Sequence, residues 1–174
     1  MDKKAVLFNT EQVTKNFQLY EFFIASRPQH TFIFPVALMQ AAQIIRDWVG
    51  FETDVTSTSR PADPFGYHRY DAALDLCTPY VIHGVKPSKT PEQILEAFKT
   101  ECMNYINGKG SQLIDKLRKA GVNGFGVECG CIHMDVRPDH PLNRKDSYGT
   151  YCVFEFKCHY NKKGEMIIDI NRAL

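Results

Sequence analysis

The sequence has no long hydrophobic run and no excess of one charge. No stretch approaches the roughly 18 to 20 apolar residues that cross a bilayer, and the short apolar stretch after the first lysines is too brief for an export signal. We therefore expect a protein that is cytoplasmic as synthesised and has no membrane partner. With 21 Lys and Arg against 20 Asp and Glu, the formal net charge is +1, so a dedicated nucleic-acid partner is not expected.

Internal repeats, low-complexity tracts and interdomain linkers are also absent, so residues 1–174 are interpreted as a single domain. A chain of 174 residues, of which 44% are hydrophobic, buries enough surface to fold without a disulfide or a metal. A metal ion would therefore serve function rather than folding. We expect a monomer, because no long apolar stripe is left unassigned.

The chain contains six cysteines, which could in principle form disulfides. Because no export signal is found, we expect synthesis in a reducing compartment and therefore free thiols. Cys152 and Cys158 fit this expectation, since they share one face of a predicted strand with two phenylalanines. At such positions cysteine behaves as a small buried hydrophobe.

Hydrophobic periodicity and capping residues predict three helices. Residues 35–50 begin with a proline, carry apolar side chains at helical spacing and end at a glycine. Residues 90–108 begin with Thr-Pro-Glu-Gln, which supplies an N-cap, a first-turn proline and a capping-box glutamine. Residues 111–121 run from an N-cap serine to a glycine and are expected to form a short amphipathic helix.

Beyond residue 121 the apolar residues alternate, which predicts antiparallel strands over residues 127–136, 151–159 and 165–170. Residues 161–164 are the expected turn between the last two strands. Residues 54–87 contain four prolines and two glycines and therefore predict a long ordered loop followed by a strand. Long loops inside compact domains are often functional. Helices followed by an antiparallel sheet predict the α+β class.

Four residues are candidates for binding a metal ion or for supporting a residue that binds it: His68, Asp75, His133 and Asp135. Two histidines and one carboxylate suit a catalytic zinc that keeps a fourth position open for water. His133 and Asp135 are two residues apart on a predicted strand and therefore point to one face. His68 and Asp75 are seven residues apart, so a bend is required between them, and residues 70–73 with their small alanines could supply it.

The same residues allow other interpretations. His68 could be a solvated loop histidine, and His133 could be a hydrogen-bonded histidine in a half-buried strand. Cys129, Cys131, His133 and Asp135 alternate and could share one face as a thiolate site. Thiolate-rich zinc sites need four close ligands, however, and alternate residues of one strand are too far apart for all of them to reach one ion.

The segment around the first histidine resembles a known family. Arg60 ends the sequence Ser-Thr-Ser-Arg, and His68, Ala73 and Asp75 follow it. This order is similar to the Ser-Gly-Tyr-Arg-like turn and the Ser-x-His-x-x-Gly-x-Ala-x-Asp motif of the M15 family of zinc peptidoglycan peptidases.

The segment around the last histidine resembles the same family. Residues 131–137 are similar to the family's His-Val-Asp-Val strand, and the likeness as a whole covers most of residues 13–137. The resemblance implies a hedgehog/DD-peptidase-like fold, with helices packed on a small antiparallel sheet. It also implies a Zn2+ ion held by His68, Asp75 and His133.

A zinc-dependent peptidase of this kind would have a peptidoglycan stem peptide or muropeptide as its partner. Members of the family cleave D-Ala-D-Ala or L-Ala-D-Glu bonds, and many phage members are endolysins, which reach the cell wall at lysis. The metal would polarise the scissile carbonyl and activate a bound water. By the same resemblance, Arg60 would stabilise the oxyanion or hold a carboxylate of the peptide.

One departure from the family concerns the general base. Many members have Glu or Asp three residues before the last histidine, where this chain has Gly130. Glu128 is the nearest upstream carboxylate and is the candidate base, which must take a proton from water and return it to the leaving amine. Because Glu128 lies five residues before His133, we expect it on the opposite side of a regular strand. It would then reach the site only through a bulge at Gly126 or Gly130.

The missing base allows a second interpretation of the function. The chain could be a catalytically weakened member of the same fold that keeps zinc for structure or binds a wall peptide without cutting it. If the ligand pattern is accidental, the chain is instead an α+β interaction domain without a metal.

Overall fold

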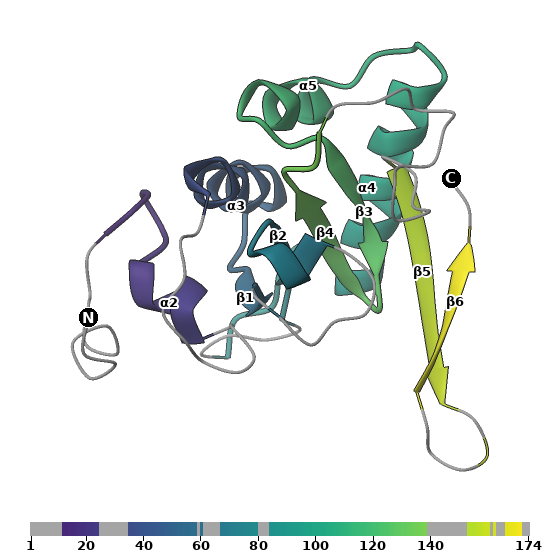
Figure 1. Ribbon diagram of the computed structural model, residues 1–174, viewed down its shortest axis with the longest axis horizontal. Helices are drawn as coiled ribbons and strands as arrows, with labels where there is room; N and C mark the ends of the chain where they lie inside the picture. The colour runs from purple at the N-terminus through teal and green to yellow at the C-terminus, as the bar shows by residue number, and fades with distance from the viewer. Residues whose placement is uncertain are drawn as a thin grey trace.

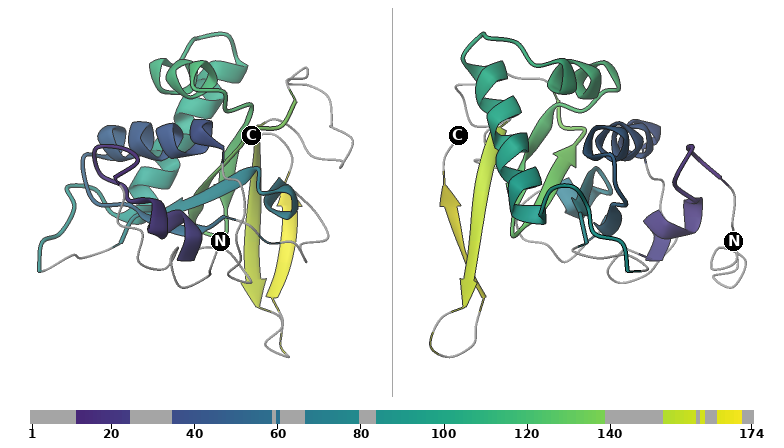
Figure 2. Two further views of the ribbon diagram at one scale, coloured as in Figure 1. Left: turned by 60° about the vertical axis from the view of Figure 1, so that its left-hand side comes forward. Right: turned by 180° about the vertical axis from the view of Figure 1, so that it is seen from behind.

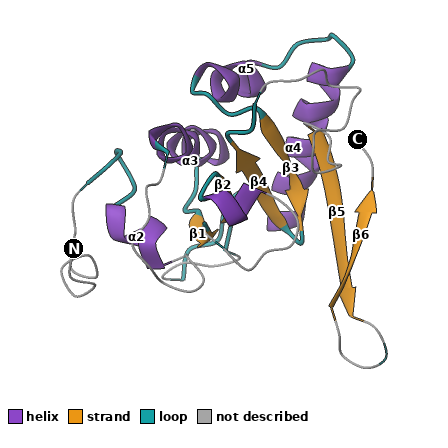
Figure 3. Ribbon diagram, in the orientation of Figure 1, coloured by secondary structure: helices purple, strands orange, loops and turns teal. Residues whose placement is uncertain are grey.

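The computed structural model describes residues 12–24, 35–58, 60, 67–79, 84–138, 153–160, 162 and 166–171. Within this part of the chain, six strands form one sheet in the order β1-β2-β4-β3-β5-β6 (Figure 1). The strands are β1 (Asp54–Ser57), β2 (Ala73–Cys77), β3 (Gly124–Glu128), β4 (Cys131–Asp135), β5 (Val153–Tyr160) and β6 (Met166–Asn171). The helices are α2 (Leu19–Ile24), α3 (Val36–Val49), the 3-10 helix η1 (Tyr67–Tyr70), α4 (Pro91–Ile106) and α5 (Gln112–Lys119). Figure 3 shows the helices in purple and the strands in orange. The predicted α+β class is therefore confirmed.

The three predicted helices are present, and each has at least one of its predicted end signals. Helix α3 ends at Gly50, which adopts a left-handed conformation with φ of 69°. Helix α4 begins with a full capping box, in which the Gln93 amide donates to the Thr90 hydroxyl and the Thr90 amide donates to the Gln93 side chain. The Ser111 hydroxyl caps α5 by accepting from the Ile114 amide at 3.1 Å. None of the helices in these described ranges is both long and apolar enough to cross a membrane.

The strand predicted over residues 127–136 is in fact a hairpin. Strands β3 and β4 pair antiparallel from Gly124 opposite Asp135 to Glu128 opposite Cys131. The two residues between them, Cys129 and Gly130, both have positive φ, at 51° and 87°. Positive φ at both central residues defines the type I′ turn, whose twist matches that of the flanking strands. The prediction of one continuous strand was wrong because alternation alone does not reveal a two-residue turn.

The sheet is mixed rather than purely antiparallel. Strand β5 pairs parallel with β3, with Gly126 opposite Phe154, while β5 and β6 form the expected antiparallel pair. A parallel pair requires a crossover connection instead of a tight turn. The chain between β4 and β5 is long enough to make that crossover, so the expectation of antiparallel pairing throughout is corrected at this one pair.

One face of the central strands packs against α3 and α4, and α5 packs in turn against these two helices. Figure 2 shows α3 and α4 on the near side of the sheet when the molecule is seen from behind. The strand residues that face these helices belong to one buried hydrophobic cluster together with the inner faces of the three helices. They are Leu74, Leu76, Phe125, Val127, Ile132 and Met134. Because strand side chains alternate, the residues between them face the other side of the sheet.

The expectation of free thiols is wrong for three of the cysteines. Cys77 and Cys131 form a disulfide with their Cα atoms 4.7 Å apart. The sheet register explains the pairing, since Leu76 is opposite Ile132 and the two cysteines occupy the next position of the same antiparallel pair. Cys129 is also disulfide-bonded, whereas Cys102 is free and buried as expected. Cys152 and the side chain of Cys158 lie outside the described part of the structure.

Candidate metal centre

The candidate site lies on the face of the sheet opposite the helices. Asp75 on β2 is directly opposite His133 on β4, and His133 is in turn opposite Gly126 on β3. Residues that are directly opposite in an antiparallel pair point to the same face. Asp75 and His133 therefore share one face of the sheet, on which Gly126 of β3 is the next position in the row.

Four side chains converge on this face. His133 Nδ1 lies 2.8 Å from Asp75 Oδ1 and 3.4 Å from Glu128 Oε2. His68 Nε2 lies 3.2 Å from the same Asp75 oxygen and 3.3 Å from His133 Nδ1. One donor atom from each of the four residues lies within 4.8 Å of every other, which is close enough to surround one metal ion. The structure thus brings together the three predicted ligands and Glu128, and His68 and His133 are buried, not solvated.

His68 reaches the site from η1, and the predicted bend between His68 and Asp75 is present. Asp71 has a positive φ of 58°, and the Ala72 amide donates to the Tyr67 carbonyl at 3.1 Å. Aspartate is one of the few residues other than glycine that tolerate this left-handed conformation. The turn reverses the chain just before β2 begins, so that His68 lies over the strand that carries Asp75.

Hydrogen bonds fix the orientation of both imidazole rings. His68 Nδ1 is bonded to the backbone carbonyl of Thr58, so this nitrogen carries the proton and Nε2 presents a lone pair to the cluster. His133 Nε2 lies 3.1 Å from Asp135 Oδ2 and donates to it, which leaves Nδ1 facing the cluster. Lone pairs and carboxylate oxygens that converge in a buried site require a cation among them. The donor set of two imidazoles and two carboxylates therefore fits a metal ion, and it is a set that zinc accepts.

Asp135 supports the cluster without belonging to it. Its carboxylate is fully buried and accepts from Arg137 Nε at 2.7 Å as well as from His133. The Arg137 guanidinium in turn lies 4.6 Å from the centroid of the Tyr67 ring, next to His68 in η1. Burial raises the pKa of Asp135, but hydrogen bonds from Arg137 and His133 outweigh burial and lower it to about 2. Asp135 thus remains ionised and holds His133 in one tautomer.

Two members of the cluster have shifted pKa values in the metal-free protein. Burial lowers the pKa of His133, but hydrogen bonds to Asp135 and Asp75, with the charges of Asp75 and Glu128, outweigh burial and raise it to about 10. For Asp75, burial raises the pKa while His68 and His133 lower it more, so the carboxyl titrates well below its usual range. A proton on His133 therefore takes the place that a metal ion would have among these groups.

Glu128 enters the site by a different route from the predicted one. Because residues 129 and 130 form a hairpin turn, Glu128 is opposite Cys131 and shares the face of His133 without any bulge. Gly130, where the family often has its base, lies in this turn. The thiolate alternative is also corrected, since Cys129 and Cys131 are both disulfide-bonded.

Arg60 stands at the outer edge of the cluster. One nitrogen, Nη2, lies 3.6 Å from both Asp75 Oδ2 and Glu128 Oε1. Its side chain is 31% exposed, whereas that of Asp75 is 8% exposed. Arg60 is therefore the group of the cluster that a ligand arriving from solvent would meet first.

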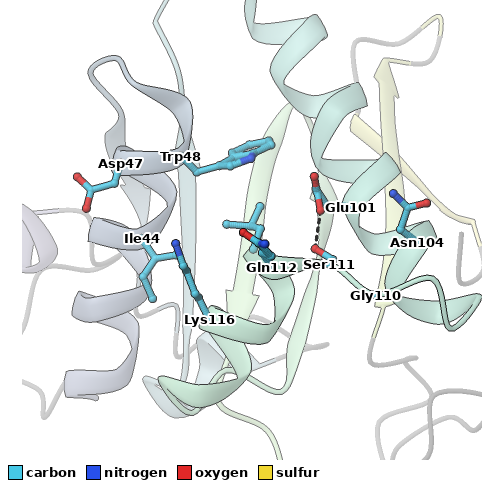
Figure 4. Close-up of a pocket in the computed structure, with 10 residues that line it drawn as sticks. Ile44, Asp47, Trp48, Glu101, Asn104, Gly110, Ser111, Gln112 and Lys116 are labelled. Atoms are coloured by element: carbon cyan, nitrogen blue, oxygen red, sulfur yellow. Dashed lines mark hydrogen bonds between the residues drawn. The ribbon is translucent and has the colours of Figure 1, made fainter.

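A separate cavity of about 530 Å³ lies among α3, α4 and α5, on the helical side of the sheet (Figure 4). Three of its polar lining residues are already paired within the protein. Ser111 donates to Glu101 at 2.5 Å, and Asp47 accepts from Gln43 at 2.8 Å. Among the described residues, the group whose donor atoms could surround one metal ion is the cluster of His68, Asp75, Glu128 and His133, so it is the stronger candidate site.

Sequence reasoning identified Asp135 as a neighbour of the ligands but missed Arg137, which holds Asp135 in place. The signal was present, because the alternation His133-x-Asp135-x-Arg137 extends the site face by one more residue. Comparison of the chain with protein-family models, curated proteins and solved structures finds no match. The resemblance to the zinc peptidases thus rests on the sequence motifs alone.

Proposed function

We propose that this protein is a zinc-dependent peptidase that hydrolyses a peptide bond in peptidoglycan stem peptides, on a hedgehog/DD-peptidase-like fold. The observation that carries the proposal is the convergence of His68 Nε2, His133 Nδ1 and Asp75 Oδ1 beside a further carboxylate, Glu128. Two histidines and one carboxylate are the ligand set of catalytic zinc sites that keep one position open. The sequence motifs supply the substrate class, a stem peptide or muropeptide reached when the cell lyses.

Each polar group of the site has a role in this reaction. Zinc, when bound, supplies a Lewis acid for the scissile carbonyl and lowers the pKa of a bound water. Glu128 would accept a proton from that water and transfer it to the leaving amine. Arg60 would hold a carboxylate of the peptide or the developing oxyanion, because its guanidinium is a partly exposed cation at the edge of the site.

A second function is favoured by the position of Glu128 itself. Its Oε2 lies 3.4 Å from His133 Nδ1, close enough for Glu128 to be a fourth ligand rather than a base. A zinc ion with four protein ligands has no open position and is typical of structural sites. In that case the protein would bind a wall peptide, or use the ion for structure, without cutting the peptide.

The variant Glu128→Gln separates the two functions. If Glu128 is the base, zinc affinity stays close to that of the wild type while hydrolysis of a purified muropeptide falls by about 100- to 10,000-fold. Glu96→Gln is a matched control, because Glu96 is an exposed carboxylate on α4 that pairs only with Lys99 among the ion pairs of the described residues. A large loss of zinc affinity in Glu128→Gln, together with a wild type that cleaves no stem peptide, would favour the closed site.

A further inference from the structure

We propose that Ser57 is a positioning residue of the metal centre, whose hydroxyl holds the outer carboxylate oxygen of Asp75 when an ion is bound. The inference rests on the proposed metal centre but not on peptide hydrolysis. The proposed partner of Asp75 lies on β1, which is one of the two edge strands of the sheet.

A bulge in β1 brings Ser57 to the face of the site. Val55 is opposite Leu76, but the register then shifts, so that Ser57 and not Thr56 is opposite Asp75. The Thr56 hydroxyl donates to the backbone carbonyl of Asp75 at 3.2 Å and so holds the bulge in place. Bulges next to functional sites commonly re-aim a side chain. Here the bulge extends the row of Asp75 and His133 by one more polar residue.

The Ser57 hydroxyl has no hydrogen-bond partner within the described residues, although Ser57 is only 8% exposed. A buried hydroxyl without a partner costs free energy. Ser57 is in register with Asp75 of the candidate metal centre, so that carboxylate is the group that could supply the missing partner. Directly opposite residues of an antiparallel pair have Cβ atoms about 4.5 to 5.5 Å apart. A serine hydroxyl can cross that separation to a carboxylate oxygen by side-chain rotation alone.

Asp75 has an oxygen that suits this role. Its Oδ1 faces both histidines, whereas Oδ2 has Arg60 Nη2 at 3.6 Å, which is longer than a hydrogen bond. A metal ion on Oδ1 would leave Oδ2 pointing away from the ion and able to accept. Carboxylate ligands are usually held through their second oxygen by such an outer hydrogen bond.

This geometry predicts that Ser57→Ala weakens metal binding without lowering the stability of the metal-free protein. In the metal-free protein the hydroxyl makes no hydrogen bond to the described residues, so its removal should leave the unfolding midpoint in urea unchanged or higher. In the loaded protein the bond is lost, so Co2+ affinity, measured by competition with a chelating dye, should fall about tenfold. The visible absorption bands of bound Co2+ should also shift, because the Asp75 carboxylate changes its orientation.

Thr53→Val is the matched control. Thr53 is also buried, at 3% exposure, and its hydroxyl likewise has no partner among the described residues, but it lies before β1 and outside the ladder. This variant should change neither Co2+ affinity nor the absorption bands. Unchanged Co2+ affinity in Ser57→Ala, or an equal loss in both variants, would overturn the inference. So would a fall in metal-free stability, which would indicate a merely structural serine.

Hydrolysis is a separate measurement. A wild-type protein that binds Co2+ but cleaves no stem peptide contradicts the peptidase proposal and leaves the Ser57 result intact. A wild-type protein that binds no Co2+ overturns both proposals.

Discussion

The two faces of the central strands are both largely buried, but they are chemically opposite. On the helix side, Leu74, Phe125 and Met134 are fully buried among other apolar side chains. On the other side, His133 is 3% exposed and Asp135 is fully buried, yet both are polar or charged. The apolar face is stabilised by removing hydrocarbon from water. The polar face is stable because its buried charged groups have partners of complementary charge or hydrogen-bonding capacity.

The comparison shows why burial alone does not identify a core. On the apolar face, substitutions that conserve volume are tolerated because the attraction has no direction. On the polar face, every group depends on the orientation of the next, from Tyr67 through Arg137 and Asp135 to His133. The two faces should therefore respond differently to mutation, and the following predictions test that difference.

The largest effect is expected when the polar face loses two of its donors. In His68→Ala with His133→Ala, both imidazole ligands are gone, and zinc affinity should fall by a factor on the order of 1,000 or more. Elemental analysis of protein purified without a chelator should find about one zinc per chain in the wild type and none in the double variant. Full retention of zinc by the double variant would show that the ion binds elsewhere.

A substitution on the apolar face should give the opposite pattern. Phe125 is fully buried and packs against Tyr105 with ring centroids 5.9 Å apart. Phe125→Ala should lower the free energy of unfolding by about 3 to 5 kcal/mol, through lost burial and a cavity. Urea denaturation of the metal-free protein measures this loss. The folded variant should still bind one zinc, and loss of zinc under folding conditions would show that the two faces are coupled.

The sequence predicted the features that depend on neighbouring residues. Helices α3, α4 and α5 carry their own caps, and the alternation of His133 and Asp135 correctly placed both side chains on one face. The bend before β2 was also predictable, because residues 70–73 combine a turn-forming aspartate with small residues. These signals lie within a few residues of the structure that they specify.

Features that depend on pairing between distant segments were missed. The Cys77–Cys131 disulfide and the parallel pairing of β3 with β5 follow from sheet register, which single-strand periodicity does not encode. The position of Glu128 was mispredicted for a related reason, since a two-residue turn changes which residues share a face. The sequence therefore predicted the candidate ligands and Asp135, which supports His133, but not Arg137 or the face on which Glu128 lies.

Gly124 tests how closely the polar face is packed. It is opposite Asp135, and a Cβ atom at this position would collide with Asp135 Oδ1 and Arg137 Nε. Gly124→Ala should displace this buried ion pair and lower the free energy of unfolding by about 2 to 3 kcal/mol. Zinc affinity should fall as well, because His133 loses its orienting partner. Unchanged stability and zinc affinity would show that the Asp135 and Arg137 pair can shift without cost.

The smallest effect concerns the proton that occupies the site in the absence of metal. Because the pKa of His133 is raised to about 10, its stabilising contribution in the metal-free protein is complete below pH 6.5 and is lost as the pH rises through 10. Zinc requires a neutral imidazole, so binding at pH 7 should release about one proton per ion, and affinity should rise about tenfold per pH unit.

Calorimetric titration in two buffers of different ionisation enthalpy measures this proton release directly. Phe125→Ala is the control, because a substitution on the apolar face leaves the neighbours of His133 unchanged and should release the same number of protons. If zinc binds to the wild type without releasing a proton, His133 is already neutral in the metal-free protein. The polar face would then be held together without an ion pair between His133 and Asp75. It would differ less from the apolar face in its dependence on charge than the geometry indicates.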